Sequence, residues 1–199
     1  MEAMQLAEII RILQRSNLRL LSLGDLKKLL GIKEDNTAYK TAEKLVKQEV
    51  LLRLKKGLYA SSFSSPHEFE QANYLYSPSY VSLESALNYY GMLSQFPYTI
   101  TSITPRKSKK IDSRQKEYEF VHCAEGLYWG YEKQNNFLIA LPEKALVDEI
   151  YLVSKGLRTV SFDELDLSKI NQKKFREFCG KIKYLPFNNL VQTIFKRKR

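Results

Sequence analysis

Cationic and small polar side chains recur between residues 36 and 56, and their chemistry is that of a DNA-binding surface. Ammonium and guanidinium groups bind phosphate oxygens, whereas small polar groups pair with base edges in the major groove. We expect Thr37, Tyr39 and Lys40 to lie near base edges and the later cations to lie on phosphates. The candidate DNA-binding residues are Asn36, Thr37, Tyr39, Lys40, Lys44, Lys47, Arg53, Lys55 and Lys56.

The first of these residues are predicted to share one side of a helix that begins after Asp35 or Asn36, either of which is a good N-cap. The helical period places a group of apolar residues on the other side, where they can pack on neighbouring helices. This pattern is typical of a recognition helix, although a surface helix with a solvated lysine side shows it too. The apolar residues are Ala38, Ala42, Leu45 and Val46.

Two shorter amphipathic segments precede this helix and are predicted to support it. The first carries an apolar stripe at helical spacing. In the second, Ser22 and Asp25 have the spacing of a capping box, and Gly31 offers a helix stop. Residues 32–34 leave only a tight connection to the third helix, so the spacing fits a helix-turn-helix. The residues expected to face inward are Leu6, Ile9, Ile10, Leu13, Leu21, Leu23, Leu26 and Leu30.

A basic β-hairpin is predicted directly after the recognition helix. Leucines and cations alternate from Leu52 to Lys55, which is the period of a strand with one buried face. Gly57 permits the positive φ of a tight turn, and residues 58–60 form the return strand. Three helices followed by such a hairpin indicate a winged helix-turn-helix DNA-binding domain over residues 1–62, with an ordinary α+β scaffold as the alternative.

The composition is that of a globular protein with an anionic partner. The chain has 199 residues, of which 44% are hydrophobic, and its formal net charge is +10. It can therefore bury one or two small cores. It contains no run of about 18 apolar residues, and its first residues lack the pattern of a signal peptide, so we expect a cytoplasmic protein without a membrane partner. Cys123 and Cys179 are predicted to be free thiols.

The positive charge is concentrated at the two ends of the chain. Residues 1–63 hold 12 Lys and Arg against 7 Asp and Glu, and residues 169–199 hold 10 against 1. Residues 64–168 hold 10 against 14. Because Lys and Arg displace the counterions of nucleic acid, basic ends predict salt-dependent binding to DNA. The cationic run over residues 106–110 is a candidate secondary phosphate contact.

A Ser-rich stretch closed by Pro66 is predicted to link the first domain to an α+β domain over residues 67–199. The tail from about residue 169 is expected to be basic and helical, with a break at Pro186. Helices are predicted over residues 67–76, 83–90 and 142–153. Strands of a mainly antiparallel sheet are predicted over residues 98–103, 118–122, 127–131 and 137–140.

The second domain offers no set of residues that predicts catalysis. Ser82 and Ser85 have no base partner in the sequence, and Glu84 suits a helix N-terminus. Lys144 and Asp148 are expected to form an i, i+4 pair on a helix surface. A metal site needs three or four ligands, whereas the chain owns two His and two Cys, so neither a metal nor a cofactor is expected. We therefore predict that the protein is not an enzyme.

Tyrosine is concentrated in the first half of the second domain. Nine of the 13 tyrosines fall between Tyr74 and Tyr131. They have the composition of a platform on which the bases of single strands stack. Packing within strands and the core explains them more simply.

Four blocks of sequence, taken in order, resemble the AbiEi family of antitoxin-type transcriptional regulators. The blocks are PSYVSLESALNYYGML at residues 78–93, TITSITPRK at residues 99–107, LYWGY at residues 127–131 and IALPEKALVDEIY at residues 139–151. The RLKKGLY segment at residues 53–59 is similar to the wing of that family's N-terminal domain. The resemblance spans about residues 5–155.

The resemblance implies a DNA-binding repressor and antitoxin of a type IV toxin–antitoxin, or abortive infection, system. Such a protein represses its own operon by binding operator repeats in double-stranded DNA, and it opposes a nucleotidyltransferase toxin encoded beside it. Some members of the family stand alone as regulators. The residues themselves leave two more alternatives open: a nuclease-like enzyme that lacks a recognisable catalytic constellation, and an adaptor whose winged helix binds protein. The oligomeric state is also open, because the sequence contains no heptad seam.

Overall fold

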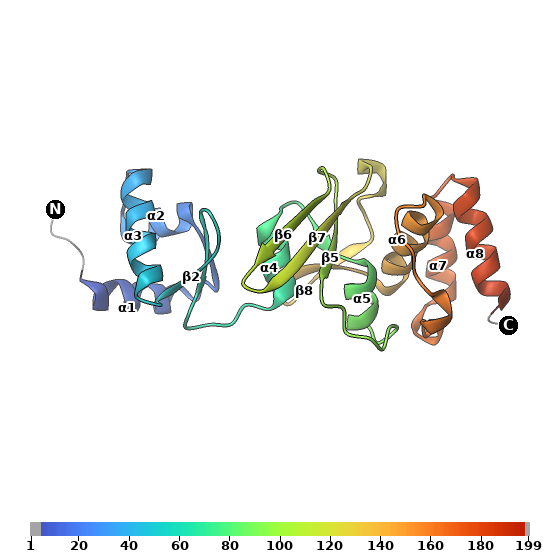
Figure 1. Cartoon of the computed structure of the whole chain (residues 1–199), viewed down its shortest axis with the longest axis horizontal. Helices are drawn as coiled ribbons and strands as arrows, with labels where there is room; N and C mark the ends of the chain where they lie inside the picture. The colour runs from blue at the N-terminus through green and yellow to red at the C-terminus, as the bar shows by residue number, and fades with distance from the viewer. Residues whose placement is uncertain (1–4, 198–199) are drawn as a thin grey trace. The chain divides into compact units, whose positions relative to one another are not determined.

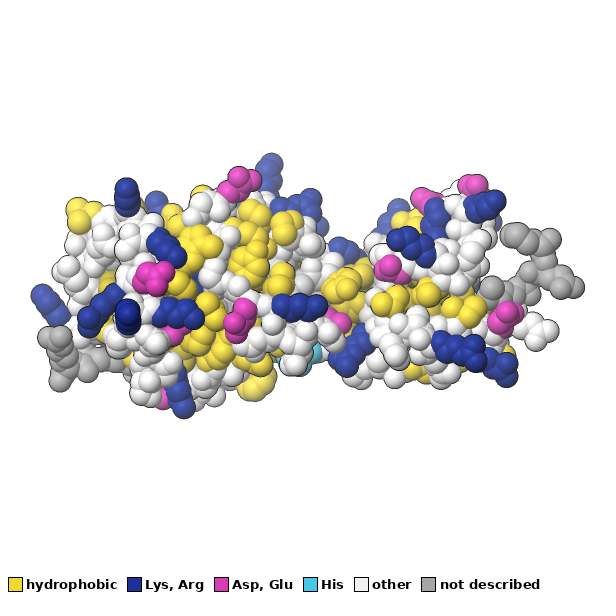
Figure 2. All heavy atoms as spheres, turned by 180° about the vertical axis from the view of Figure 1, so that it is seen from behind, with side chains coloured by type: hydrophobic (Ala, Val, Ile, Leu, Met, Phe, Trp, Pro, Cys, Tyr) yellow, Lys and Arg dark blue, Asp and Glu magenta, His cyan; other side chains and the backbone are white. Residues whose placement is uncertain are grey.

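The structure, a computed structural model, describes residues 5–197, except for the side chain of Arg197. The chain is divided into two compact units, residues 1–75 and residues 76–199 (Figure 1). The sequence places a linker at residues 61–66, whereas the division between the units comes after residue 75, so that helix α4 (Glu68–Leu75) groups with the amino-terminal unit. Lys and Arg side chains are present on the surfaces of both units (Figure 2).

The amino-terminal unit contains the three predicted helices and the predicted hairpin, together with one strand that the sequence pattern does not predict. Its elements are α1 (Leu6–Ser16), β1 (Leu20–Ser22), α2 (Leu23–Leu30), α3 (Asp35–Lys47), β2 (Leu51–Lys55), β3 (Leu58–Ser61) and α4. The three strands form an antiparallel sheet in the order β1-β3-β2. The unpredicted strand, β1, is held by the pairing of Leu20 with Ala60 and of Leu21 with Tyr59.

Helix α2 begins and ends as the sequence predicts. The backbone N–H of Asp25 donates to Ser22 Oγ (3.1 Å), and the backbone N–H of Ser22 donates to Asp25 Oδ2 (2.8 Å). This reciprocal arrangement is a capping box and satisfies two backbone donors at the helix start. Gly31 ends the helix with a φ of 64°, a conformation that strains residues with a Cβ.

Helix α3 begins one residue earlier than expected, and the predicted cap at Asp35 or Asn36 is wrong. The N-cap residue is Glu34, which makes no side-chain hydrogen bond to the helix. Asp35 lies inside the first turn and forms an ion pair with Lys27 of α2. Its carboxylate is therefore used to join α2 to α3 and to complement the helix dipole, rather than to cap the backbone.

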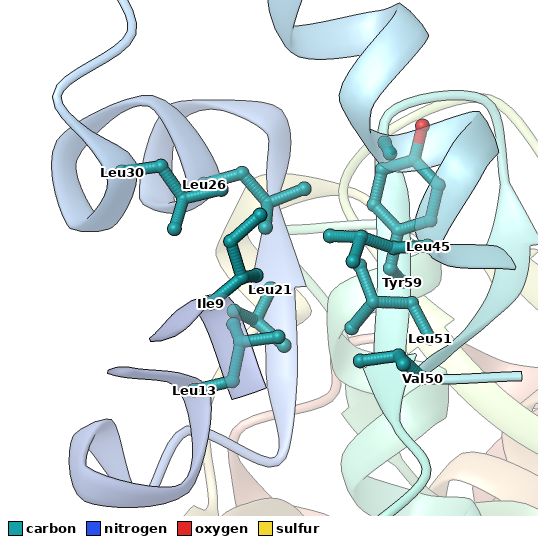
Figure 3. Close-up of a cluster of buried hydrophobic side chains, with 10 residues drawn as sticks. Ile9, Leu13, Leu21, Leu26, Leu30, Leu45, Val50, Leu51 and Tyr59 are labelled. Carbon is teal, nitrogen blue, oxygen red and sulfur yellow. The ribbon is translucent and has the colours of Figure 1, made fainter. Parts of the chain in front are cut away.

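The predicted apolar stripes meet in one core within the amino-terminal unit. Figure 3 shows side chains from α1, α2, α3 and the sheet pointing toward one another. Three residues predicted to face inward, Leu6, Ile10 and Val46, are only partly buried at the edge of this core, and Leu23 is partly buried outside it. Burying each of the larger side chains stabilises the fold by roughly 1.5–3 kcal/mol. The buried members are Ile9, Leu13, Leu21, Leu26, Leu30, Ala42, Leu45, Val50, Leu51 and Tyr59.

Strand β2 departs from simple alternation. The predicted inward pair is Leu52 and Leu54, but Leu51 and Leu54 are the buried residues and Leu52 is only partly buried. The pairing of β2 with β3 shifts between Arg53 and Lys55, as it does at a β-bulge. A bulge adds one residue to one strand, so the alternation of faces is interrupted there.

The carboxy-terminal unit is an α+β fold built on one six-stranded sheet. Its strands are β4 (Tyr80–Val81), β5 (Ile100–Thr104), β6 (Lys109–Ser113), β7 (Lys116–His122), β8 (Tyr131–Gln134) and β9 (Phe137–Ala140). They lie in the order β6-β7-β5-β4-β9-β8. The sheet is mixed where a mainly antiparallel one is predicted, because β5 pairs with β7 and β4 pairs with β9 in parallel.

The helices of this unit are α5 (Leu83–Tyr89), α6 (Pro142–Ser154), α7 (Gln172–Gly180) and α8 (Leu185–Arg197), with 3-10 helices at Glu125–Leu127, Phe162–Glu164 and Leu167–Lys169. The predicted tail is helical, but Pro186 does not break it. The chain turns before α8, and Pro186 lies in the first turn of that helix, where its fixed φ and missing N–H are tolerated. Residues 198–199 of the basic terminus lie outside the described residues.

The predicted strand at residues 127–131 is also corrected by the structure. A 3-10 helix ends at Leu127, and β8 begins only at Tyr131. The indole N–H of Trp129 donates to the carbonyl oxygen of Gly126 (3.0 Å), and Gly130 has a φ of 77°. The aromatic composition of this segment resembles that of a strand, but these local contacts turn the chain.

Lys144 and Asp148 form their predicted pair inside the unit, not on its surface. The Lys144 side chain is 1% exposed and that of Asp148 is 8% exposed. Lys144 Nζ also donates to the hydroxyl of Tyr80 (2.9 Å), which in turn donates to Asp148 Oδ2 (3.0 Å). The hydroxyl of Ser82 donates to the same carboxylate oxygen (2.8 Å). Burial is tolerated because both charges are paired and hydrogen-bonded.

A second buried charge network surrounds Arg158. Its Nη1 donates to Glu119 Oε2 (3.0 Å), its Nε donates to Glu149 Oε1 (3.3 Å), and its Nη2 pairs with Glu84. Glu149 is fully buried. Burial, helped by the neighbouring carboxylate of Glu84, raises the pKa of Glu149 to about 8 against the opposing effect of Arg158.

We predict that Glu149→Gln makes the free energy of unfolding less dependent on pH. The pKa of Glu149 rises from 4.5 to about 8 on folding, so its stabilising contribution is complete below pH 4.5 and is lost as the pH rises through about 8. In that window the slope from one group is at most about 1.4 kcal/mol per pH unit. The measurement is urea unfolding at several pH values, followed by the fluorescence of Trp129, the single tryptophan.

The matched control for this experiment is Glu125→Gln, which removes an exposed carboxylate from the same unit. We expect this variant to keep the pH dependence of the parent chain. If Glu149→Gln and Glu125→Gln have the same stability profile between pH 5 and pH 8, the Glu149 carboxyl is not protonated in the folded state, contrary to the direction of its pKa shift.

Candidate nucleic-acid interface

Helix α3 places most of the predicted DNA-binding residues on its solvent side. The inner side is occupied by Ala38, Ala42 and Leu45, which are buried. Tyr39 is partly buried at the edge between the two sides. The residues exposed on the outer side include Asn36, Thr37, Lys40, Lys44 and Lys47.

The cations of this surface are not neutralised within the unit. Among residues 5–197, no ion pair is formed by Lys40, Lys44, Lys47, Arg53 or Lys56. Two exposed acids lie on the same helix: Glu43, and Asp35, which is paired with Lys27. An unpaired ammonium group keeps its full attraction for an external anion, so this side of α3 suits a polyanionic ligand.

The hairpin turn lies against the first half of α3. Lys56 Nζ lies 5.7 Å from the ring centroid of Tyr39, within the range of a cation–π contact. Gly57 has a φ of 76°, and a Cβ built on it would lie 3.5 Å from the Tyr39 hydroxyl. Tyr39, predicted to read base edges, therefore also supports the turn and holds Lys56 beside the helix.

A cleft of about 150 Å³ separates the second half of α3 from the hairpin strands. It is lined by Lys47 and Arg53, together with Glu43, Val46 and Tyr59. Arg53 is paired across the strands with Tyr59, so the sheet register brings these two side chains together. Burial raises the pKa of the Tyr59 hydroxyl, and Arg53 opposes that shift. The cleft thus combines two cations with a neutral hydrogen-bonding hydroxyl.

Three members of this cleft, Glu43, Val46 and Tyr59, are absent from the residues predicted as the site. Tyr59 has a sequence signal, because Arg53 and Tyr59 stand on either side of the turn at Gly57. The β-bulge shifts the register near that turn, so the pairing does not follow from counting outward from Gly57. Glu43 is recognisable as part of the outer face of α3.

Lys55 is predicted to bind a phosphate, but its ammonium group makes hydrogen bonds within its own unit. Its Nζ donates to the carbonyl oxygens of Tyr74 (3.5 Å) and Leu75, at the last turn of α4. The last carbonyls of a helix lack intrahelical partners and carry partial negative charge. Lys55 therefore caps α4, and its ammonium group is already used within the unit.

The cationic run at residues 106–110 is largely occupied by internal contacts. Arg106 Nη1 donates to the carbonyl oxygen of Ser77 (2.9 Å), and its guanidinium lies 4.9 Å from the ring centroid of Tyr76. Lys110 forms an ion pair with Glu117 (3.4 Å). This segment consequently offers less free positive charge for a secondary phosphate contact than the sequence predicts.

Polar residues near α5 and β7 have structural partners in the carboxy-terminal unit. Ser85 Oγ accepts from the backbone N–H of Thr101 (2.9 Å). His122 Nδ1 lies 2.9 Å from the carbonyl oxygen of Arg106. Cys123 and Cys179 are free, and burial raises the pKa of these thiols to about 11 and about 12. Within the described part of the chain, no cluster of three His, Cys, Asp or Glu residues is arranged to hold a metal.

The concentration of tyrosines in this unit is explained at least in part by packing. The Tyr80 ring stacks on Tyr131, with centroids 4.7 Å apart, and lies 5.2 Å from Tyr128. Tyr80 and Tyr118 are fully buried. The rings of Tyr80 and Tyr118 are therefore not available to bases, whereas Tyr74, Tyr89 and Tyr98 are exposed.

No model of a known protein family matches the chain, and no curated protein sequence matches it either. None of the helices within residues 5–197 combines the length and apolarity needed to cross a membrane.

We predict that Gly57→Ala destabilises the hairpin by roughly 1–2 kcal/mol, because a Cβ at a φ of 76° strains the backbone. The matched control is Gly24→Ala. Gly24 lies in α2, and a Cβ built there makes only an ordinary contact, 3.5 Å from Ser22 Oγ, so alanine should be neutral or stabilising. Hydrogen–deuterium exchange of peptides covering residues 50–61 measures both changes. Equal exchange in the two variants contradicts the proposed strain at the turn.

Proposed function

We propose that the amino-terminal unit is a winged helix-turn-helix that binds duplex DNA, and that the protein is a DNA-binding transcriptional repressor. The observation that carries this proposal is the set of exposed lysines on α3, on the side opposite the buried Ala38, Ala42 and Leu45. The connection from α2 to α3 and the antiparallel β1-β3-β2 sheet support it, because a winged helix has these parts.

In the proposed complex, α3 enters the major groove with its outer side. Thr37 and Lys40 then approach base edges, and Lys44 approaches a phosphate. The cleft between α3 and the hairpin follows the sugar–phosphate backbone, with Lys47 and Arg53 on either side of it. Lys56, held against Tyr39, reaches the adjacent phosphates or the minor groove.

We further propose that this repressor is an antitoxin of a type IV toxin–antitoxin, or abortive infection, system. The support is the resemblance of the four sequence blocks to the AbiEi family. It implies repression of the protein's own operon and opposition to a nucleotidyltransferase toxin. Co-expression with the product of an adjacent nucleotidyltransferase-like gene tests this part: rescue of growth supports an antitoxin, whereas DNA binding without rescue favours a stand-alone regulator.

The DNA-binding proposal predicts that the double variant Lys40→Ala, Lys44→Ala binds duplex DNA from its own promoter more weakly. Removing the phosphate contact of Lys44 should also flatten the plot of log affinity against log salt by about 0.9. Because Lys40 is placed at a base edge, its loss should reduce discrimination among sequences more than it changes the salt slope. The measurement is fluorescence anisotropy at several salt concentrations, with the fold checked by circular dichroism.

The control variant is Arg114→Ala, Lys133→Ala, which lowers the net charge by the same amount in the carboxy-terminal unit. Both side chains are exposed, and within the described residues neither forms an ion pair. We expect its duplex affinity and salt slope to stay close to those of the parent. A folded Lys40→Ala, Lys44→Ala variant that binds as tightly as this control excludes α3 as the DNA-binding surface.

A further inference from the structure

We propose that the carboxy-terminal helices form a second nucleic-acid site, a groove that binds a single strand. The groove has a volume of about 720 Å³ and lies among the 3-10 helix at residues 167–169, α7 and α8. Its walls combine apolar side chains with amides and an arginine. The inference concerns a different unit from the proposed duplex site and does not depend on duplex binding.

The floor of the groove is apolar and partly aromatic. Phe175 of α7 and Phe195 of α8 line it, with ring centroids 5.0 Å apart. Phe175 is buried, whereas Phe195 is only partly buried, so part of an aromatic ring is accessible from the groove. Unstacked bases bind to such rings, because every base has an apolar face that can stack on an aromatic side chain.

Polar groups at the edge of the groove can recognise bases and the backbone. Gln172 and Gln192 line it and are exposed, and within residues 5–197 neither carboxamide makes a side-chain hydrogen bond. A carboxamide donates and accepts at once, as the edge of a base does. Arg176 stands beside them as a phosphate ligand. The carboxylate of Asp166 also lines the groove, and it accepts from the backbone N–H of Ser168 (2.9 Å).

Free cations continue beyond the groove along the same elements. Glu177 is the single acid among residues 169–199, and it pairs with Lys181 (3.3 Å). Figure 2 shows Lys and Arg side chains around apolar ones on this unit. The exposed cations that form no ion pair within the described residues are Lys169, Lys173, Arg176, Lys183 and Lys196.

The position of Lys173 and Lys174 is informative because they occupy the first turn of α7. Cations there oppose the positive end of the helix dipole, so they reduce the stability of the helix slightly. An ion pair with Glu143 (3.9 Å) offsets the unfavourable interaction of Lys174 with the dipole, but among the described residues Lys173 has no such ion pair. An external anion next to this turn is favoured both by the lysines and by the dipole.

These features fit a single strand better than a duplex or an acidic protein segment. A duplex keeps its bases stacked, so it satisfies the cations and leaves the aromatic groove unused. An acidic segment carries charge at intervals, whereas exposed cations lie on the elements that form the groove and in the loop between α7 and α8, as suits a continuous phosphate chain. The occupant is therefore a single-stranded RNA or DNA that places a base on Phe195.

The experiment measures binding of labelled single strands of about 12 nucleotides, rich in adenine and free of secondary structure, as RNA and as DNA. Fluorescence anisotropy of the full chain at several salt concentrations gives affinity and salt slope. We expect Lys173→Ala, Arg176→Ala to weaken binding about tenfold and to flatten the slope. Phe195→Leu keeps the groove apolar, and we expect it to weaken binding several-fold without changing the slope, because stacking is not ionic.

Two further variants keep the test decisive. Gln192→Ala alters an exposed side chain and should weaken binding without affecting folding, so it replaces Phe195→Leu if that variant unfolds. Lys40→Ala, Lys44→Ala should leave single-strand binding intact while it weakens duplex binding. Failure of the duplex proposal therefore leaves this site standing, and failure of this site leaves the duplex proposal standing.

Three results overturn the inference. In the first, Phe195→Leu and Gln192→Ala both fold and bind single strands as tightly as the parent, which makes the surface a charge patch only. In the second, Lys173→Ala, Arg176→Ala weakens duplex binding more than single-strand binding, which makes it a duplex contact. In the third, an acidic helical peptide displaces the strand as well as an unlabelled strand of equal charge does, which makes it a protein-binding groove.

Discussion

A buried lysine constrains the carboxy-terminal unit more than any other side chain described. An ammonium group at 1% exposure must be fully partnered, and Lys144 is partnered by Asp148, by the Tyr80 hydroxyl and by the ring of Trp129, whose centroid lies 4.8 Å away. The backbone at Gly130 passes so close to the lysine stem that an added Cβ would lie 2.9 Å from Lys144 Cγ. One side chain thereby fixes strand β4, helix α6 and the turn before β8 in relation to one another. Removing either charge alone would leave the other buried without its partner, which is far less favourable than having neither.

This network gives a physical meaning to three of the four sequence blocks on which the proposed antitoxin role rests. Tyr80, Trp129 and Lys144 come from three of the four blocks, and they contact one another in the interior. The blocks therefore contain residues that hold the interior of this unit together. Function depends on the groups that a surface exposes more than on the fold that carries them. The cations of α3 and α7 are exposed in this way, and the proposed nucleic-acid sites are built from them.

Local signals in the sequence predict most helices, whereas contacts between distant residues explain what the sequence does not predict. The capping box at Ser22 and the glycines after α2 and α5 act within a few residues, so helix ends follow from them.

Strand β1 exists only because it pairs with β3, which comes almost 40 residues later, beyond the reach of a local pattern. In the same way, the partner of Lys55 is a carbonyl 20 residues away. The spacing of Lys144 and Asp148 predicts that they pair. It does not predict that the pair is buried, because burial depends on which distant elements pack on that side of the helix.

The ion pairs of the carboxylates also explain why the acidic middle segment does not neutralise the basic ends of the chain. Carboxylates of the carboxy-terminal unit are paired internally: Glu84 and Glu119 with Arg158, and Glu117 with Lys110. Acids used in this way screen few of the exposed cations on α7, so the positive charge there remains available to a ligand although the segment before it is acidic. The same holds for α3, where the acid of the first turn is paired with Lys27 and the lysines are not. Under the two proposals, the salt dependence of nucleic-acid binding by the whole chain is a sum over two surfaces, and it can be assigned to one of them only by removing charge from each in turn.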